Sequence, residues 1–192
     1  MFIMSFVWKP DYFTSYDRVI RTALNGWTIT GVWTANSGQP FTVLTGTDNY
    51  FDGQASNRPS IVPGKFPHLI NNGGSRVAME NQWFDTSAYC VTGTIVTGTT
   101  TPCPGLGPLN LLGNTRPAQL SDPGYRNVDA SLFRDFAIYE RVRFQLRGEA
   151  TNVFNLTNLG APTATMNSAN FGKITGSGGS NRILQVGGRI LF

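Results

Sequence analysis

The sequence is poor in the residues that usually identify an enzyme or a metal protein. Its 192 residues include one histidine and two cysteines, and only 14% are charged, compared with about a quarter in an average globular domain. No run of about 18 apolar residues occurs, so the sequence predicts no transmembrane helix. The apolar start, MFIMSFVWKP, lacks the basic region and cleavage site of a signal peptide. We therefore expect a chain that is not exported, or a reading frame that has lost its true N-terminus.

Catalytic and nucleic-acid-binding motifs are also missing. His68 is the sole histidine, and it lies in a long predicted loop without the activated nucleophile that a catalytic triad needs. The sequence has neither a G-x-S-x-G motif nor a phosphate-binding P-loop. Its basic residues are scattered rather than clustered into a nucleic-acid-binding patch. We therefore expect no enzymatic activity, no cofactor and no nucleic-acid partner.

One acidic turn has the oxygen ligands that Ca²⁺ prefers. Asp48, Asn49 and Asp52 lie in the segment TDNYFDG. However, Tyr50 stands at the third position and Pro59 at the twelfth, which breaks the order of an EF-hand loop. We interpret the segment as a polar turn and expect no bound metal.

The two cysteines, Cys90 and Cys103, lie in one segment rich in Gly, Thr and Pro. Their spacing and the absence of a partner histidine argue against a zinc site. A disulfide between them would fit an extracytoplasmic compartment. Two unrelated thiols are the alternative, because sequence alone carries no geometry.

What the chain does contain is a set of segments in which apolar and polar residues alternate, as in β-strands. WTITGVWTAN at 27–36 shows the pattern most clearly. The link 140–142 is so short that the strands on either side form an antiparallel hairpin, whereas 9–26 leaves room for a short helix. We predict strands at 2–8, 27–44, 127–139, 143–155 and 182–192.

Two segments between these strands, 45–126 and 156–181, show little periodicity and are far longer than ordinary loops. Short links and long loops therefore alternate along the chain. This asymmetry is typical of outer-membrane barrels, which have tight periplasmic turns and long external loops. The sequence thus predicts an all-β fold, an antiparallel transmembrane β-barrel segment of about five strands with two long extracellular loops.

The segment RGEATNVFN at 147–155 carries charges in the middle of a predicted strand. In a transmembrane barrel these side chains face a wet lumen, while the alternate positions face lipid. Tryptophans suit the aromatic girdles at the membrane boundaries, although a soluble core would also use them. We predict lumen-facing Gln145, Arg147, Glu149, Gln185 and Arg189, and girdle positions Trp8, Trp27 and Trp33. Asp129, Arg147, Glu149 and Arg189 could line a lumen together, but we prefer ordinary charge pairing on a wet face.

Six segments follow one another in a recognisable order: GWTITGVWTANSGQPFTVLTG (26–46), NRP (57–59), WFDTSAY (83–89), NVDASLFRDFAIYERVRFQLRGEATNVFNLTNLGAP (127–162), FGKI (171–174) and RILQVGGRILF (182–192). In this order they resemble the C-terminal part of TonB-dependent outer-membrane receptors, most of all the Oar-like kind that carries a carboxypeptidase-regulatory-like domain. The resemblance implies a barrel of about 22 strands with a plugged lumen, importing a scarce solute with energy from the inner membrane. It also implies that Phe192, with Ile190, is the signal recognised by the barrel-insertion machinery.

The chain departs from that family in having too few strands to close a barrel, which takes about eight. We therefore expect a bacterial outer-membrane fragment or truncated product that is not transport-competent alone. Its partners would be membrane lipid and either the missing plug and remaining strands or further copies of itself. The alternative interpretation is a soluble all-β module that binds glycans or a protein. The sequence does not identify the solute.

Overall fold

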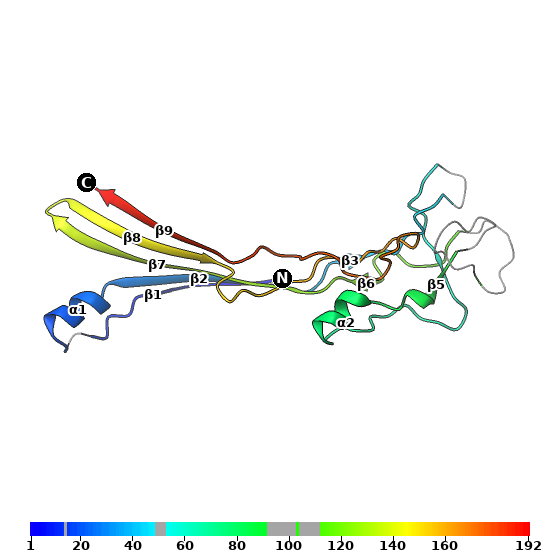
Figure 1. The fold of residues 1–192 in the computed structure, drawn as a ribbon, viewed down its shortest axis with the longest axis horizontal. Coiled ribbons are helices and arrows are strands. Elements are labelled where there is room, and N and C mark those ends of the chain that lie inside the picture. Colours follow the sequence, from blue (N-terminus) through cyan, green and yellow to red (C-terminus); the bar gives the residue numbers. More distant parts are fainter. Residues whose placement is uncertain (14, 49–52, 92–102, 104–111) are drawn as a thin grey trace. The chain divides into compact units, whose positions relative to one another are not determined.

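The computed structural model describes residues 1–13, 15–48, 53–91, 103 and 112–192 (Figure 1). The chain divides into two compact units. The sheet unit comprises Met1–Asn36, Tyr125–Thr157 and Gly179–Phe192, and the loop unit comprises Ser37–Gly124 and Asn158–Gly178. Within the described residues, no helix has the length and apolar character needed to cross a membrane.

The sheet unit is one antiparallel sheet in the order β1-β2-β7-β8-β9. Helix α1, Arg18–Leu24, lies in the link between β1 and β2, and Glu140 and Arg141 form the turn between β7 and β8. We call the end that carries this link and this turn the turn end, and the opposite one the far end. The five strands are β1 Phe2–Trp8, β2 Trp27–Asn36, β7 Tyr125–Tyr139, β8 Val142–Thr151 and β9 Ile183–Leu191.

Two expected strands end earlier than predicted. The strand expected at 27–44 ends at Asn36, and only Pro40–Phe41 continues it, as β3 in a separate two-stranded sheet. At Gly38 the chain passes so close to the backbone of Asp122 that any side chain would collide with it. Glycine therefore allows the chain to leave the large sheet at this point. The strand expected at 143–155 ends at Thr151, because the next residue leaves the extended conformation.

The strand register sorts the side chains of the sheet onto two chemically different faces, since successive residues of a strand point to opposite sides. On one side, Phe6 covers Gly31 and Phe144 covers Gly188. The apolar face carries Phe2, Met4, Phe6, Trp8, Trp27, Ile29, Gly31, Trp33, Arg126, Val128, Ala130, Leu132, Arg134, Phe136, Phe144, Leu146, Gly148, Ala150, Leu184, Val186, Gly188 and Ile190. The polar face carries Ile3, Ser5, Val7, Thr28, Thr30, Val32, Thr34, Asn127, Asp129, Ser131, Phe133, Asp135, Gln145, Arg147, Glu149, Gln185, Gly187 and Arg189.

The loop unit is more ordered than expected. Segments predicted as long loops form a core of their own, in which Phe84 is in contact with the rings of Phe41, Tyr89 and Phe171. Both predicted loops contribute, because Met166 and Ile174 are buried in the same cluster. Two-residue strands carry no readable periodicity, which is why the sequence did not reveal them. The elements are β3 Pro40–Phe41, β4 Ser60–Ile61, α2 Arg76–Asn81, the 3₁₀ helix η1 Thr86–Ala88, β5 Tyr89–Cys90 and β6 Leu120–Ser121.

A disulfide joins Cys90 and Cys103 within the loop unit, with their Cα atoms 4.8 Å apart. Both residues are buried, at 0% and 7% exposed. Cys90 also lies in β5, which pairs with β4 at Ser60. The crosslink therefore ties Cys103 to the core at β5.

Asn152 holds the far end of the sheet together. It adopts a positive φ of 50° and is 3% exposed. Its side-chain amide donates to the carbonyls of Leu156 and Ser180, at 2.9 and 3.0 Å, and its side-chain oxygen accepts from the Leu156 amide at 2.7 Å. Asparagine tolerates this left-handed conformation better than other residues with a side chain. One residue therefore ends β8 and connects it to the start of β9.

We predict that Asn152→Ala lowers the free energy of unfolding by about 4 kcal/mol, since three side-chain hydrogen bonds contribute about 1 kcal/mol each and alanine at a positive φ costs about 1 kcal/mol more. Asn152→Gly should cost less, because glycine relieves the positive φ. Asn155→Ala is the matched control: it has a φ of 53° but an exposed side chain, and should cost about 1 kcal/mol. Urea unfolding in detergent micelles, followed by tryptophan fluorescence, measures all three. Equal losses for Asn152→Ala and Asn155→Ala would contradict the role of the hydrogen bonds.

Candidate functional site

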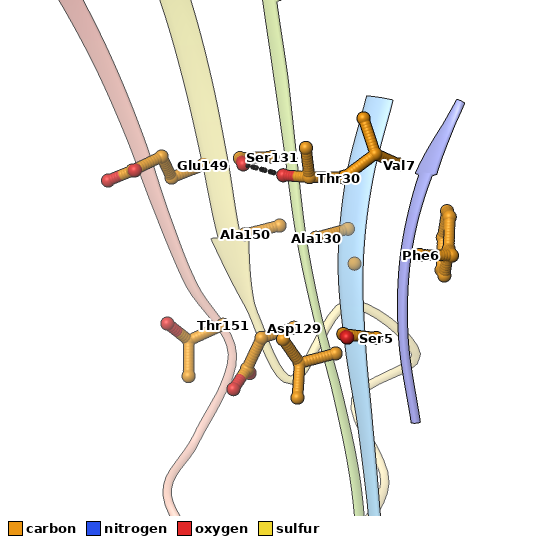
Figure 2. Close-up of a pocket in the computed structure, with 12 residues that line it drawn as sticks. Ser5, Phe6, Val7, Thr30, Asp129, Ala130, Ser131, Glu149, Ala150 and Thr151 are labelled. Atoms are coloured by element: carbon orange, nitrogen blue, oxygen red, sulfur yellow. Dashed lines mark hydrogen bonds between the residues drawn. The ribbon is translucent and has the colours of Figure 1, made fainter. Parts of the chain in front are cut away.

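The centre of the polar face is the candidate site, because residues of four strands with hydroxyl or carboxylate side chains border one hollow there (Figure 2). One rung across the sheet consists of Val7, Thr30, Ser131 and Glu149. The Oγ atoms of Thr30 and Ser131 lie 2.5 Å apart in a hydrogen bond. Alternating strand geometry places short polar side chains side by side on this face.

The next rung toward the far end contains Ser5, Val32 and Asp129, and Thr151 lies beside Asp129 in Figure 2. Together the two rungs border an open hollow of about 360 Å³. The hollow exists because Ser, Thr and Val are short. It can offer hydroxyl groups and the carboxylates of Asp129 and Glu149 to a hydrated polar solute.

The charged residues predicted for the lumen share the polar face. Gln145 lies opposite Arg189, and Glu149 lies opposite Gln185. Arg147 forms an ion pair with Glu149 along the same strand, with both side chains partly exposed. Whether this face borders a lumen stays a prediction.

Asp129 is held by amides, whereas the sequence had suggested a charge group with Arg147, Glu149 and Arg189. Its Oδ1 accepts from the Asn127 side chain at 2.8 Å and from the Asn152 backbone at 2.9 Å. The structure therefore brings Arg147 and Glu149 together and draws Asp129 into the Asn152 junction. Asn152 carried a signal that the sequence analysis did not use, namely two asparagines in TNVFN, the residue type that favours a positive φ.

The three predicted girdle tryptophans lie on the apolar face, toward its two ends. Trp8 and Trp27 are at the turn end, where the Trp8 indole donates to the Tyr12 hydroxyl at 3.4 Å. Trp33 lies toward the far end, with its ring 5.3 Å from that of Phe2 in an edge-on contact. Their place at a membrane boundary stays a prediction, as does the role of Phe192 and Ile190, which are 99% and 61% exposed.

The remaining candidates form no site among the residues that the structure describes. His68 is exposed, and its Nδ1 lies 2.9 Å from the Phe66 carbonyl oxygen. The Asp48 carboxylate accepts from the Gly53 amide at 2.8 Å, as in a polar turn, while Asn49 and Asp52 lie outside the described residues. In the part of the chain that the structure describes, no group of three His, Cys, Asp or Glu side chains is arranged to hold a metal.

Two buried ionisable groups in the loop unit were missed by the sequence analysis. Burial, and to a lesser degree the nearby Asp85 carboxylate, raises the pKa of Tyr89 above its ordinary value of 10.0. Burial also raises the pKa of Asp122. Among the described residues, the Tyr89 hydroxyl and Asp122 Oδ1 have no hydrogen-bond partner. Both positions therefore favour the neutral form of the side chain.

Comparison with known proteins gives one match. A family model described as an outer membrane beta barrel domain matches residues 1–185. No curated protein and no solved structure matches the chain.

We predict that stability decreases as pH rises through the range just above 3.8, the ordinary pKa of Asp122. A raised pKa means that the folded state binds more protons than the unfolded state in that range, so stability is lost as the carboxyl ionises. Asp122→Asn should remove this loss of stability with rising pH. The variant should therefore be more stable than the parent at pH 7, but not at pH 3. Thermal unfolding at both pH values measures it. A parent that is at least as stable as the variant at pH 7 would show that the Asp122 charge is well solvated.

Proposed function

Because the chain belongs to the outer-membrane β-barrel family, we propose that it forms part of the barrel wall of a TonB-dependent receptor for solute uptake. The family membership and the antiparallel sheet confirm the predicted all-β barrel segment and indicate an outer-membrane protein. The proposal adds the receptor type, the orientation of the sheet and its partners.

The observation that carries the proposal is an apolar sheet face that the described residues of the sheet unit leave exposed. Val186 is 83% exposed, Leu184 69% and Ile190 61%. Contiguous exposed apolar surface of this kind marks a protein or membrane contact. In lipid the same side chains are stabilised, whereas the mid-strand charges Arg147 and Glu149 require a wet lumen. The sheet can therefore contact both lipid and water only if its apolar face lies toward lipid and its polar face toward the lumen.

Further strands must be added to these five to complete such a wall. Closure takes about eight strands, and β1 and β9 are the outer strands of the described sheet. An uncovered strand edge leaves backbone groups unsatisfied, which lipid does not tolerate. We propose that further strands of a complete receptor pair with these edges, or that copies of this chain do so, and that β9 with Phe192 is read by the insertion machinery.

The receptor type is supported by the ordered phrases that resemble TonB-dependent receptors. The loop unit then contacts the solute outside the membrane, where the Cys90–Cys103 disulfide is compatible with an oxidising compartment. In this role the chain binds and lines a passage and carries out no catalysis.

The proposed orientation predicts opposite environments for neighbouring residues of β8. In Glu149→Cys the new thiol lies on the polar face, and in Ala150→Cys it lies on the apolar face. Since the two native cysteines are bonded to each other, each variant carries a single reactive thiol. Spin labels on the chain in lipid bilayers should respond to a water-soluble nickel chelate at position 149 and to lipid-dissolved oxygen at position 150.

Repeating the pair at Arg147→Cys and Leu146→Cys controls for the local depth of the label. A nickel response of equal strength at all four positions would overturn the barrel-wall proposal. It would favour a soluble binding module, in which another protein surface covers the apolar side chains.

A further inference from the structure

The sequence contains two Asn–Gly steps, Asn25–Gly26 and Asn72–Gly73. Such a step is chemically reactive, because glycine has no side chain to hinder attack of its backbone nitrogen on the preceding asparagine side chain. The conformational freedom of glycine also helps the two groups to meet. Each step can therefore convert its own asparagine where the surrounding structure leaves the reacting groups unengaged. The first step lies in the sheet unit and the second in the loop unit.

At Asn25–Gly26 both reacting groups are engaged in hydrogen bonds. The side-chain oxygen of Asn25 accepts from the Phe13 backbone amide at 3.2 Å. The Gly26 amide donates to Asp11 Oδ1 at 3.1 Å. The attack requires the Gly26 nitrogen to lose its proton, and an adjacent carboxylate disfavours the resulting negative charge. The structure therefore protects Asn25 from conversion.

At Asn72–Gly73 the described structure engages neither reacting group. Both residues are exposed, and among the described residues no hydrogen bond involves the Asn72 side chain or the Gly73 amide. The two residues form the centre of a tight turn, which closes where the Gly74 amide donates to the Asn71 carbonyl at 2.9 Å. Gly73 has a φ of 87°, and a side chain there would meet no atom within 4 Å. The Asn72 side chain therefore has open space in which to rotate toward the Gly73 nitrogen.

From this contrast we propose that Asn72 is a modification site of the loop unit, which converts spontaneously to aspartate and isoaspartate while Asn25 stays intact. The Gly73 nitrogen loses its proton and bonds to Cγ of Asn72, and the side-chain nitrogen takes up a proton and leaves as ammonia. Water then opens the resulting five-membered ring at either of its two carbonyl carbons. The net reaction consumes one water and releases one ammonia, so it needs no other reactant.

The isoaspartate product changes the backbone, because ring opening at the main-chain carbonyl adds one carbon to the chain inside the turn. The turn directly precedes α2, and Asn71 connects the two. Its side-chain amide donates to the carbonyls of Ala78 and Gln82, at 3.1 and 2.6 Å. A longer chain between Asn71 and Gly74 no longer matches the spacing that their hydrogen bond requires. Isoaspartate should therefore loosen the attachment of α2, whereas aspartate keeps the ordinary backbone and should not.

Peptide mapping by mass spectrometry tests the site on the full chain, refolded in detergent micelles and incubated at mildly alkaline pH. Conversion replaces an amide by a carboxyl group and raises the mass of the peptide by one unit. We expect at least tenfold more conversion at Asn72 than at Asn25. Equal conversion at the two positions, or no conversion at Asn72, would overturn the proposal.

Two further samples separate the effect of structure from that of sequence. In Asp11→Ala the Gly26 amide loses its acceptor, so conversion at Asn25 should increase several-fold while conversion at Asn72 stays as in the parent. Unchanged conversion at Asn25 would contradict the protective role of the carboxylate. In the parent chain unfolded in urea, the two asparagines should convert at similar rates. If Asn25 still converts tenfold more slowly there, its local sequence rather than the fold protects it, and the proposal fails.

Hydrogen exchange tests the consequence for α2, because local opening exposes backbone amides to solvent. The amides of Met79 and Gln82 donate to the carbonyls of Ser75 and Ala78, at 3.0 and 3.1 Å. In the isoaspartate form, separated by chromatography, these amides should exchange at least fivefold faster than in the parent. Asn72→Asp is the matched control, since it carries the new charge on an ordinary backbone and should exchange like the parent. Equal exchange in the isoaspartate form and in this variant would show that the added carbon does not loosen α2.

This inference goes beyond the proposed function and does not depend on it, because the turn and α2 both belong to the loop unit. If the label at position 150 reports lipid contact but Asn72 does not convert, the modification site is wrong and the barrel wall stands. If position 150 is exposed to water and Asn72 converts selectively, the barrel wall fails and the modification site stands.

Discussion

The hydrogen-bonded register of the five-stranded sheet is the constraint on which the other features depend. Because side chains alternate along a strand, a shift of one residue between β7 and β8 would move Arg147 and Glu149 to the face of Leu132 and Phe136. Across the four strand pairs the sorting has few exceptions, such as Arg126 and Arg134 on the apolar face and Phe133 on the polar face, so one sheet presents two surfaces of different chemistry. The hollow on the polar face, the tryptophans and the position of Arg134 all follow from this sorting.

The register is maintained because the strands are connected at both ends of the sheet, by different means at each end. At the turn end, Glu140 and Arg141 connect β7 to β8. At the far end, Asn152 uses a positive φ and three side-chain hydrogen bonds to end β8 and fix the start of β9. Asp129 accepts from the same junction, so a carboxylate on the polar face is tied to the geometry of the strand end. Local backbone chemistry and the surface of the site are thereby coupled.

The loop unit follows a different principle, because it buries aromatic rings in a core of its own. Phe84 and Tyr89 are 0% and 1% exposed, in contrast to the exposed aromatic and aliphatic side chains of the sheet's apolar face. The disulfide, the buried Tyr89 and the partly buried Asp122 belong to this compact unit. Two kinds of stabilisation therefore coexist in one chain: a conventional buried core, and a sheet whose apolar surface is suited to lipid.

The sequence by itself determined the long strands and their two faces, because alternation with period two is local and persists over segments such as 27–36 and 143–151. It also indicated the hairpin at 140–142 and the pair of cysteines. Only the tertiary structure decided that the segments 45–126 and 156–181 share a core, since contacts such as Phe84 with Phe171 join residues far apart in the chain. The same holds for Arg134, whose guanidinium carbon lies over the rings of Trp27 and Phe136. Along β7 alone, Arg134 is a charged residue among apolar positions. Its contact with Trp27 exists only because β2 lies beside β7 in register.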